Sequence, residues 1–149
     1  MNEKIRRARG YTLIELVFVI VVIMLVAMVA IPRMGLPFTV KMKVYTASRK
    51  LVSNLRYTRR LAITNNENYR LNVDSSTNEY EIYDSGDAQV GNTETIDSSI
   101  TVSADKDFIF EAFGNADAAS DTSISLTADG NQYDVTVTVA TGRVKMEEA

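Results

Sequence analysis

The N-terminal region contains a long apolar run, and this run limits what the chain can fold into more than any other feature. It is unbroken from Leu16 to Ile31, and between Tyr11 and Leu16 it is interrupted only by Thr12 and Glu15. As an α-helix rising about 1.5 Å per residue, residues 11–31 would span roughly the 30 Å hydrocarbon core of a membrane. The sequence therefore predicts one N-terminal membrane helix and a separate globular part.

A cleaved secretory signal peptide is the main alternative to a retained helix, because basic residues precede the apolar run. The apolar part of a signal peptide usually has about 7 to 15 residues and ends at a small-residue cleavage site. This run is longer and ends in Ile31-Pro32-Arg33. We therefore expect the helix to be retained. Basic residues lie on both sides of it, so the positive-inside count does not decide its orientation. The short basic tail at residues 1–9 is too small to be a translocated domain, which favours export of the C-terminal part.

The chain is small and lacks two residue types that much enzyme chemistry requires. Its 149 residues allow one modest globular domain beside the membrane helix, and it has no Cys and no His. Disulfides, Cys/His zinc sites, Ser-His-Asp triads and Cys-His dyads are therefore excluded. Carboxylates are plentiful, but no motif surrounds them that would indicate acid/base catalysis. We expect no catalytic site.

Charge is sorted by sign along the chain. Residues 33–60 contain eight basic side chains and no acid, whereas residues 65–149 contain four basic side chains and seventeen acids, for a net charge of −13. The simplest interpretation is a solvated basic helix beside an acidic domain. Opposite charges on two parts of one subunit also favour head-to-tail contact between copies.

After the apolar run, the sequence predicts one amphipathic helix followed by short strands. Residues 43–64 carry an apolar stripe at three-, four- and seven-residue steps, and Asn65-Asn66 supply a stop. From residue 65 the pattern alternates with period two and is divided by turns at 75–78, 129–131 and 140–142. The fold class is therefore α+β, with an antiparallel β domain at residues 65–149 packed on the helix. The predicted strands are residues 69–73, 80–82, 100–102, 108–110, 123–127, 133–139 and 143–146. The loops at 85–93 and 114–122 are expected to be polar and mobile.

Glu15 is the most informative single residue. A carboxylate at the centre of a membrane helix costs about 2.5 to 3.5 kcal/mol on insertion scales, and less near an interface, so it usually has a partner. One interpretation is that Glu15 lies at headgroup depth and is hydrated. The other is that it pairs with a cation from another subunit.

The segment Arg9-Gly10-Tyr11-Thr12-Leu13-Ile14-Glu15-Leu16, followed by the apolar run and Ala30-Ile31-Pro32, resembles the N-terminal signature of type IV prepilins and type II secretion pseudopilins. Counted from Tyr11, the Glu is fifth and the Pro is twenty-second, as in that family. The resemblance implies that residues 1–10 are a leader and that a prepilin peptidase cleaves after Gly10. It also implies N-methylation of Tyr11. Cleavage would create an α-ammonium that Glu15 of a neighbouring subunit neutralises during assembly.

Pro32 indicates a break in the helix that begins at Tyr11, because proline lacks a backbone N–H and clashes with the preceding turn. The membrane helix either stops there or, as the resemblance implies, continues and opens locally. Gly35 and Pro37 would ease such a break, and residues 33–38 are the expected hinge. The expected division of the chain is a leader at 1–10, a transmembrane and assembly helix at 11–32, a hinge and amphipathic helix at 33–64, and the β domain at 65–149.

The helix at residues 47–63 and the closing segment Thr141-Gly142-Arg143-Val144-Lys145 are similar to the GspH/FimT branch of the pilin-like proteins. The resemblance implies a structural, minor subunit of a type II secretion pseudopilus or a type IV pilus. Its expected partners are other pilins or pseudopilins, the prepilin peptidase and the inner-membrane assembly platform. The expected location is the bacterial inner membrane, with the C-terminal domain in the periplasm, and then the fibre.

Two ligands remain as alternatives. Some FimT-like proteins bind DNA through basic C-terminal residues, which here would be Arg143 and Lys145, although they lie within an acidic domain and would give weak, salt-sensitive binding. No cofactor is expected, apart from calcium as a weaker hypothesis, because hard cations bind to carboxylates in loops. The aspartates in or beside loops are Asp117, Asp121, Asp129 and Asp134, and their spacing matches no calcium loop.

Overall fold

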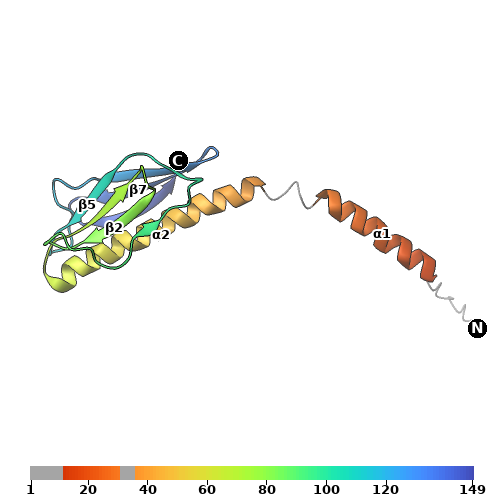
Figure 1. The fold of residues 1–149 in the computed structure, drawn as a ribbon, viewed down its shortest axis with the longest axis horizontal. Coiled ribbons are helices and arrows are strands. Elements are labelled where there is room, and N and C mark those ends of the chain that lie inside the picture. Colours follow the sequence, from red (N-terminus) through yellow and green to blue (C-terminus); the bar gives the residue numbers. More distant parts are fainter. Residues whose placement is uncertain (1–11, 31–35) are drawn as a thin grey trace, which may run out of the picture. The chain divides into compact units, whose positions relative to one another are not determined.

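A computed structural model of the chain describes residues 12–30 and 36–149 (Figure 1). The chain divides between Leu36 and Pro37 into an N-terminal unit and a compact C-terminal unit. The described helices are α1 (Leu13–Ala30) and α2 (Leu36–Asn65). The strands are β1 (Tyr69–Asp74), β2 (Glu79–Tyr83), β3 (Glu94–Thr95), β4 (Thr101–Val102), β5 (Lys106–Phe110), β6 (Ser123–Ala128), β7 (Asn131–Thr138) and β8 (Arg143–Glu148).

Helix α1 presents apolar side chains on all sides. The large apolar side chains from Leu13 to Val26 are each at least 40% exposed within the chain. Thr12 caps the N-terminus of α1, because its hydroxyl accepts the Glu15 backbone N–H at 3.3 Å. Among the described residues, no helix is both long enough and apolar enough to cross a membrane.

Helix α2 is amphipathic and ends where the sequence predicts. Its buried face repeats at helical spacing through Val44, Leu51, Leu55 and Ala62. The helix stops because Asn66 takes a left-handed conformation at φ 56° and the Glu67 N–H returns to the Ala62 carbonyl at 3.2 Å. This hydrogen bond closes a Schellman cap and satisfies one of the last free carbonyls of the helix.

Two antiparallel four-stranded sheets pack with α2. The strand order is β3-β2-β1-β5 in one sheet and β4-β6-β7-β8 in the other. The hairpin between β1 and β2 pairs Val73 with Tyr80 around the predicted turn at 75–78. The turn between β6 and β7 uses Asp129 and Gly130, both at positive φ, as a two-residue hairpin requires.

Among the described residues, the hydrophobic core lies in the C-terminal unit. Its buried apolar residues begin at Val44 and end at Val144, and Phe108 and Phe110 of β5 are among the largest that are fully buried. Tyr45 of α2 packs edge-on against Tyr133 of β7, with ring centroids 5.7 Å apart. Because this core needs no residue of α1, residues 37–149 have the interior of an independently folding domain.

Three sequence-based expectations need correction. The predicted start of the amphipathic helix at residue 43 is wrong, since α2 begins at Leu36. Pro37 therefore lies in the first turn of a helix rather than in a break, which is favourable because N–H groups there have no helical partner. The hinge prediction thus fails for residues 36–38, and Pro32, Gly35 and residues 33–35 lie outside the described residues. Strand β3 was not predicted, because its two residues are too few to show an alternation.

Candidate functional site

Glu15 lies in the first turn of α1, three residues after the capping Thr12. Its backbone N–H contacts both the hydroxyl of Thr12, at 3.3 Å, and the Thr12 carbonyl oxygen, at 3.1 Å. Thr-x-x-Glu is the pattern of a capping box, and a carboxylate in the first turn also interacts favourably with the helix dipole. The sequence analysis missed this capping-box pattern, which places the Glu15 carboxylate at the N-terminal end of the helix dipole. The predicted cleavage and methylation residues, Gly10 and Tyr11, lie outside the described residues.

Four arginines gather where the C-terminal half of α2 meets the start of β8. Arg56, Arg59 and Arg60 of α2 line a groove of about 590 Å³ together with Arg143. We call this the arginine groove. Its walls are completed by Ile63 and by residues 141, 142 and 144. The sequence analysis placed only Arg143 at this end of the domain and missed the three helical arginines.

Two of these arginines are held in place by backbone carbonyls. Arg56 donates from Nη2 to the Val144 carbonyl at 3.1 Å, and Arg59 donates from Nε to the Gly114 carbonyl at 2.6 Å. Within the described residues, no carboxylate forms an ion pair with any of the four. The groove therefore concentrates positive charge in a domain that is otherwise acidic, and an anionic partner would meet preorganised donors there.

Lys145 does not line the arginine groove. It lies two residues after Arg143 on β8, is exposed, and pairs in register with Thr136 of β7. Of the two residues predicted for DNA contact, the structure thus brings only Arg143 together with other cations.

A tight turn after β5 presents an aromatic side chain beside this groove. Phe113 is 89% exposed. The turn is closed by the Gly114 N–H on the Glu111 carbonyl at 2.7 Å and by the Glu111 N–H on the Asn115 carbonyl at 2.9 Å. Gly142 packs so closely that a Cβ there would lie 2.0 Å from the Gly114 carbonyl oxygen. The turn is therefore clamped between α2 and the turn that precedes β8.

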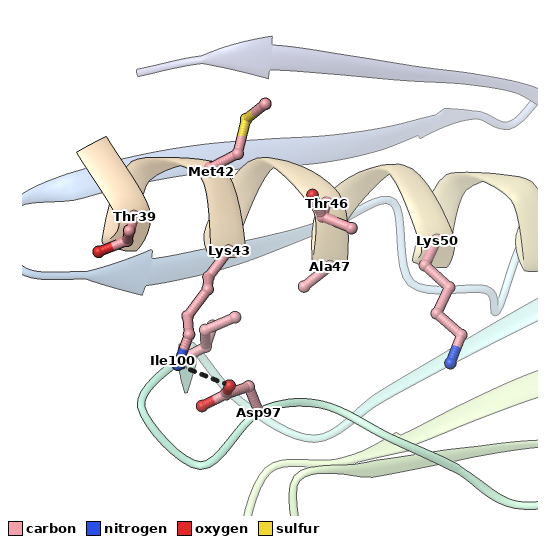
Figure 2. A pocket seen from close by; sticks show the side chains of 8 residues that line it. All are labelled: Thr39, Met42, Lys43, Thr46, Ala47, Lys50, Asp97 and Ile100. Atoms are coloured by element: carbon pink, nitrogen blue, oxygen red, sulfur yellow. Dashed lines mark ion pairs between the residues drawn. The ribbon is translucent and has the colours of Figure 1, made fainter. Parts of the chain in front are cut away.

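A second, largely apolar groove lies at the N-terminal end of α2 (Figure 2). It has a volume of about 530 Å³ and lies between one flank of α2, including Met42, Thr46 and Ala47, and the segment that carries Asp97 and Ile100. We call it the Ala47 groove. Lys43 and Lys50 cross from the helix to this segment and form ion pairs, Lys43 with Asp97 at 3.0 Å and Lys50 with Glu94 at 2.5 Å.

Carboxylates near the Ala47 groove are held in their charged form. The hydroxyl and the backbone N–H of Ser99, followed by Lys43, hold the pKa of Asp97 far below its ordinary value. The hydroxyl of Ser76 lowers the pKa of Asp74, and the hydroxyl of Ser75 lowers that of Asp105. The hairpin between β1 and β2 lies beside the groove, because Asn78 donates to the carbonyl of Ile100 at 3.3 Å.

The four aspartates considered for calcium are dispersed. Asp121 pairs with Lys106 at 3.0 Å, Asp117 accepts the Ala119 N–H at 2.7 Å, and Asp134 accepts the side-chain amide of Gln132 at 2.9 Å. Within the described residues, no three acidic side chains come together in a way that could hold a metal ion. The structure therefore gives no geometric support to the calcium hypothesis.

Comparison with known proteins gives two family matches. The model described as "Type II transport protein GspH" matches residues 47–145, and the model of the prokaryotic N-terminal methylation motif matches residues 5–31. No curated protein matches the chain in sequence.

Several solved structures share the fold. The type IV minor pilin FimU of Pseudomonas aeruginosa is 18% identical with a TM-score of 0.60, over 74% of this chain and 92% of that chain. The minor pseudopilin EpsH from the type II secretion system of Vibrio cholerae is 11% identical with a TM-score of 0.58, over 71% of this chain and 97% of that chain. The predicted pilin-like α+β fold is thereby confirmed.

Proposed function

Because the chain belongs to the GspH family and is therefore a structural subunit of a type II secretion pseudopilus or a type IV pilus, we propose that it assembles through a charge pair between Glu15 of one subunit and the N-terminal amine of its neighbour. The family consists of pilin-like structural proteins that assemble with other pilins, and no catalytic role is proposed.

The exposed surface of α1 supports assembly through this helix. A helix that is apolar on all sides is stable only when other apolar groups surround it, either lipid or neighbouring helices. In such surroundings a lone charge is costly, and breaking a buried ion pair by removing one partner costs about 3 to 5 kcal/mol. A carboxylate at position 15 would therefore select the arrangement of neighbours that brings a cation to it.

Processing supplies that cation. We propose that a prepilin peptidase removes residues 1–10 after Gly10 and that the new amine on Tyr11 is methylated, which leaves it positively charged. The match of residues 5–31 to the methylation motif supports this proposal. The same match supports anchoring in the inner membrane through residues 11–32, a periplasmic C-terminal unit and delivery to the fibre by the assembly platform. A hinge at Pro32 and Gly35 remains part of this proposal.

The experiment must separate the charge of Glu15 from its capping role. Gln fits the capping box as well as Glu does, so Glu15→Gln removes the charge and keeps the cap. Thr12→Ala does the reverse, because it removes the hydroxyl that accepts the Glu15 N–H. Each variant is expressed together with the wild type, and the ratio of the two is measured in membranes and in sheared fibres.

We expect Glu15→Gln to enter membranes normally but to be depleted from fibres about a hundredfold, as a loss of about 3 kcal/mol gives. Thr12→Ala should be depleted only a few-fold, because a cap contributes about 1 kcal/mol. Normal incorporation of Glu15→Gln would show that assembly does not need the charge of Glu15, and that the carboxylate acts as a cap or is simply hydrated. Depletion of Glu15→Gln by no more than that of Thr12→Ala would also contradict the charge pair, because losing the charge would then cost no more than losing a cap.

The arginine groove supports a second candidate function, the capture of DNA by a minor pilin of a DNA-uptake pilus. We propose it because four arginines line one groove, none of them forms an ion pair within the described residues, and guanidinium groups bind phosphates well. Labelled double-stranded DNA is titrated into the fragment of residues 37–149 at physiological salt. DNA capture predicts binding that Arg60→Ala and Arg143→Ala each weaken and that Lys145→Ala affects less, whereas the absence of binding by the wild-type fragment would remove this candidate.

A further inference from the structure

An exposed aromatic side chain stands at the edge of the arginine groove. Phe113 is the most exposed of the large apolar side chains in the described part of the C-terminal unit. The next residue, Gly114, packs closely on two residues of the groove wall, since an added Cβ would lie 2.6 Å from the Ile63 side chain and 3.4 Å from Nε of Arg59. The turn that carries Phe113 therefore borders the groove.

Apolar surface continues around this turn. The Ala116 N–H donates to the carbonyl of Val139 at 2.9 Å, which brings Val139 to the same turn. The side chains of Val139 and of Ile63 in the groove wall are exposed as well. Single exposed apolar side chains are ordinary, but apolar side chains that gather beside charged groups mark an interaction site.

The turn holds Phe113 in place before any ligand binds. Arg59 donates to the Gly114 carbonyl at 2.6 Å, and a Cβ on Gly142 would lie 2.0 Å from the same oxygen. A group on a preorganised turn loses less conformational entropy on binding than one on a free loop. The groove thus joins guanidinium groups and an aromatic side chain in one rigid frame.

These two kinds of group distinguish between the forms of a nucleic acid. Guanidinium groups bind the phosphates of a duplex and of a single strand alike. In a duplex the base faces are stacked on one another, so an exposed phenylalanine finds no partner there. A single strand leaves base faces free, and they stack on aromatic side chains that line a positively charged groove. An aromatic side chain beside arginines therefore fits a single strand better than a duplex.

We propose that the arginine groove takes single-stranded DNA, with phosphates on Arg60 and Arg143 and one base stacked on Phe113. The inference rests on the second candidate function, the capture of DNA, and names the form of DNA that the site accepts. Arg60 and Arg143 form no ion pair in the described part of the chain, whereas Arg56 and Arg59 also hold the groove together through backbone carbonyls. The stack gives no sequence preference, since every base has an aromatic face.

The test compares three labelled oligonucleotides of equal length: a thymidine strand, the same strand without its bases, and a duplex. The strand without bases keeps the phosphates and loses the stack. Each is titrated at physiological salt into the fragment of residues 37–149 and into its Phe113→Ala and Arg143→Ala variants. The matched control is Met42→Ala, which removes an exposed apolar side chain at the other end of α2. Fluorescence anisotropy of the label gives each dissociation constant.

We expect Phe113→Ala to weaken binding of the thymidine strand about tenfold, as the loss of one stacked base does, and to leave the other two oligonucleotides unaffected. Arg143→Ala should weaken binding of all three, because all three carry phosphates. Met42→Ala should change none of the dissociation constants.

A second readout reports the stack itself. The chain has no tryptophan, so Phe113→Trp places a single indole at the turn. We expect the thymidine strand to quench its fluorescence and the strand without bases to leave it unchanged. No effect of Phe113→Ala on the thymidine strand, or an equal effect on all three oligonucleotides, would overturn the stacking proposal and leave DNA capture standing. Failure of the wild-type fragment to bind any of the three would overturn both, and would leave the site to an acidic protein segment.

Discussion

The clamp between Gly142 and Gly114 allows a sharp prediction about stability. Gly142 has φ 59° and would place a Cβ 2.0 Å from the Gly114 carbonyl oxygen, far inside any normal contact. Gly130 offers a matched control, because it also lies in a hairpin turn, at φ 75°, but a Cβ there meets nothing within 4 Å. Comparing Gly142→Ala with Gly130→Ala therefore isolates the steric contact from the cost of a left-handed alanine.

The expected loss of folding free energy in each variant follows from the atoms that surround each glycine. A left-handed alanine costs about 1 kcal/mol, and this should be the whole effect of Gly130→Ala. In Gly142→Ala the Gly114 carbonyl must also move by at least about 1 Å, which breaks its 2.6 Å hydrogen bond from Arg59. A hydrogen bond from a charged donor contributes about 1.5 to 3 kcal/mol, so the total becomes about 3 kcal/mol.

Urea unfolding of the fragment of residues 37–149 measures this difference directly. With a slope of about 2 kcal/mol per M, the midpoint of Gly142→Ala should lie about 1 M below that of Gly130→Ala. Equal midpoints for the two variants would show that the turn at 111–115 yields freely, and would refute the reasoning that Phe113 is held in place.

Two further predictions concern pH. Burial raises the pKa of Tyr80 to about 12, and Asn54 donates a hydrogen bond to the Tyr80 hydroxyl at 2.7 Å. The stability that the protonated Tyr80 hydroxyl contributes is therefore complete below pH 10 and is lost as the pH rises towards 12. The stability difference between the wild type and Tyr80→Phe in urea unfolding should therefore narrow between pH 8 and pH 11, and a constant difference would contradict this. Hydrogen bonds from Ser99, and to a smaller extent Lys43, lower the pKa of Asp97. The loss of stability caused by Asp97→Asn should therefore be constant from pH 7 to pH 5 and should become smaller only below about pH 4. An Asp97→Asn effect that already shrinks by pH 5 would mean that the carboxylate is not held ionised.

Much of the C-terminal unit was predictable from local patterns. The apolar stripe from Val44 to Ala62 repeats at helical spacing, and its residues are buried or partly buried. The alternation in residues 69–73 and 133–139 likewise marks β1 and β7, because one face of each strand packs on the core. The Asn65-Asn66 stop was predictable as well, since Asn tolerates the left-handed conformation that the cap requires.

The candidate sites were less accessible from the sequence. The arginine groove joins Arg56, Arg59 and Arg60 to Arg143, and no local pattern shows which strand will lie beside a helix. The spacing of the three helical arginines does place them on one face of α2, so the helical side of the groove could be predicted from the sequence. The exposure of Phe113 was not readable, because a phenylalanine in a sequence is by default a core candidate. The capping box at Thr12 and Glu15, by contrast, is a local pattern that the sequence alone shows.

The account depends on a processed N-terminus that offers a cation to Glu15, and the mass of the intact chain recovered from sheared fibres tests it most directly. The predicted result is a single species that lacks residues 1–10, begins at Tyr11 and carries one added methyl group. A fibre-borne chain that still contains Gly10, or one that has lost the helix up to Ala30, would contradict it.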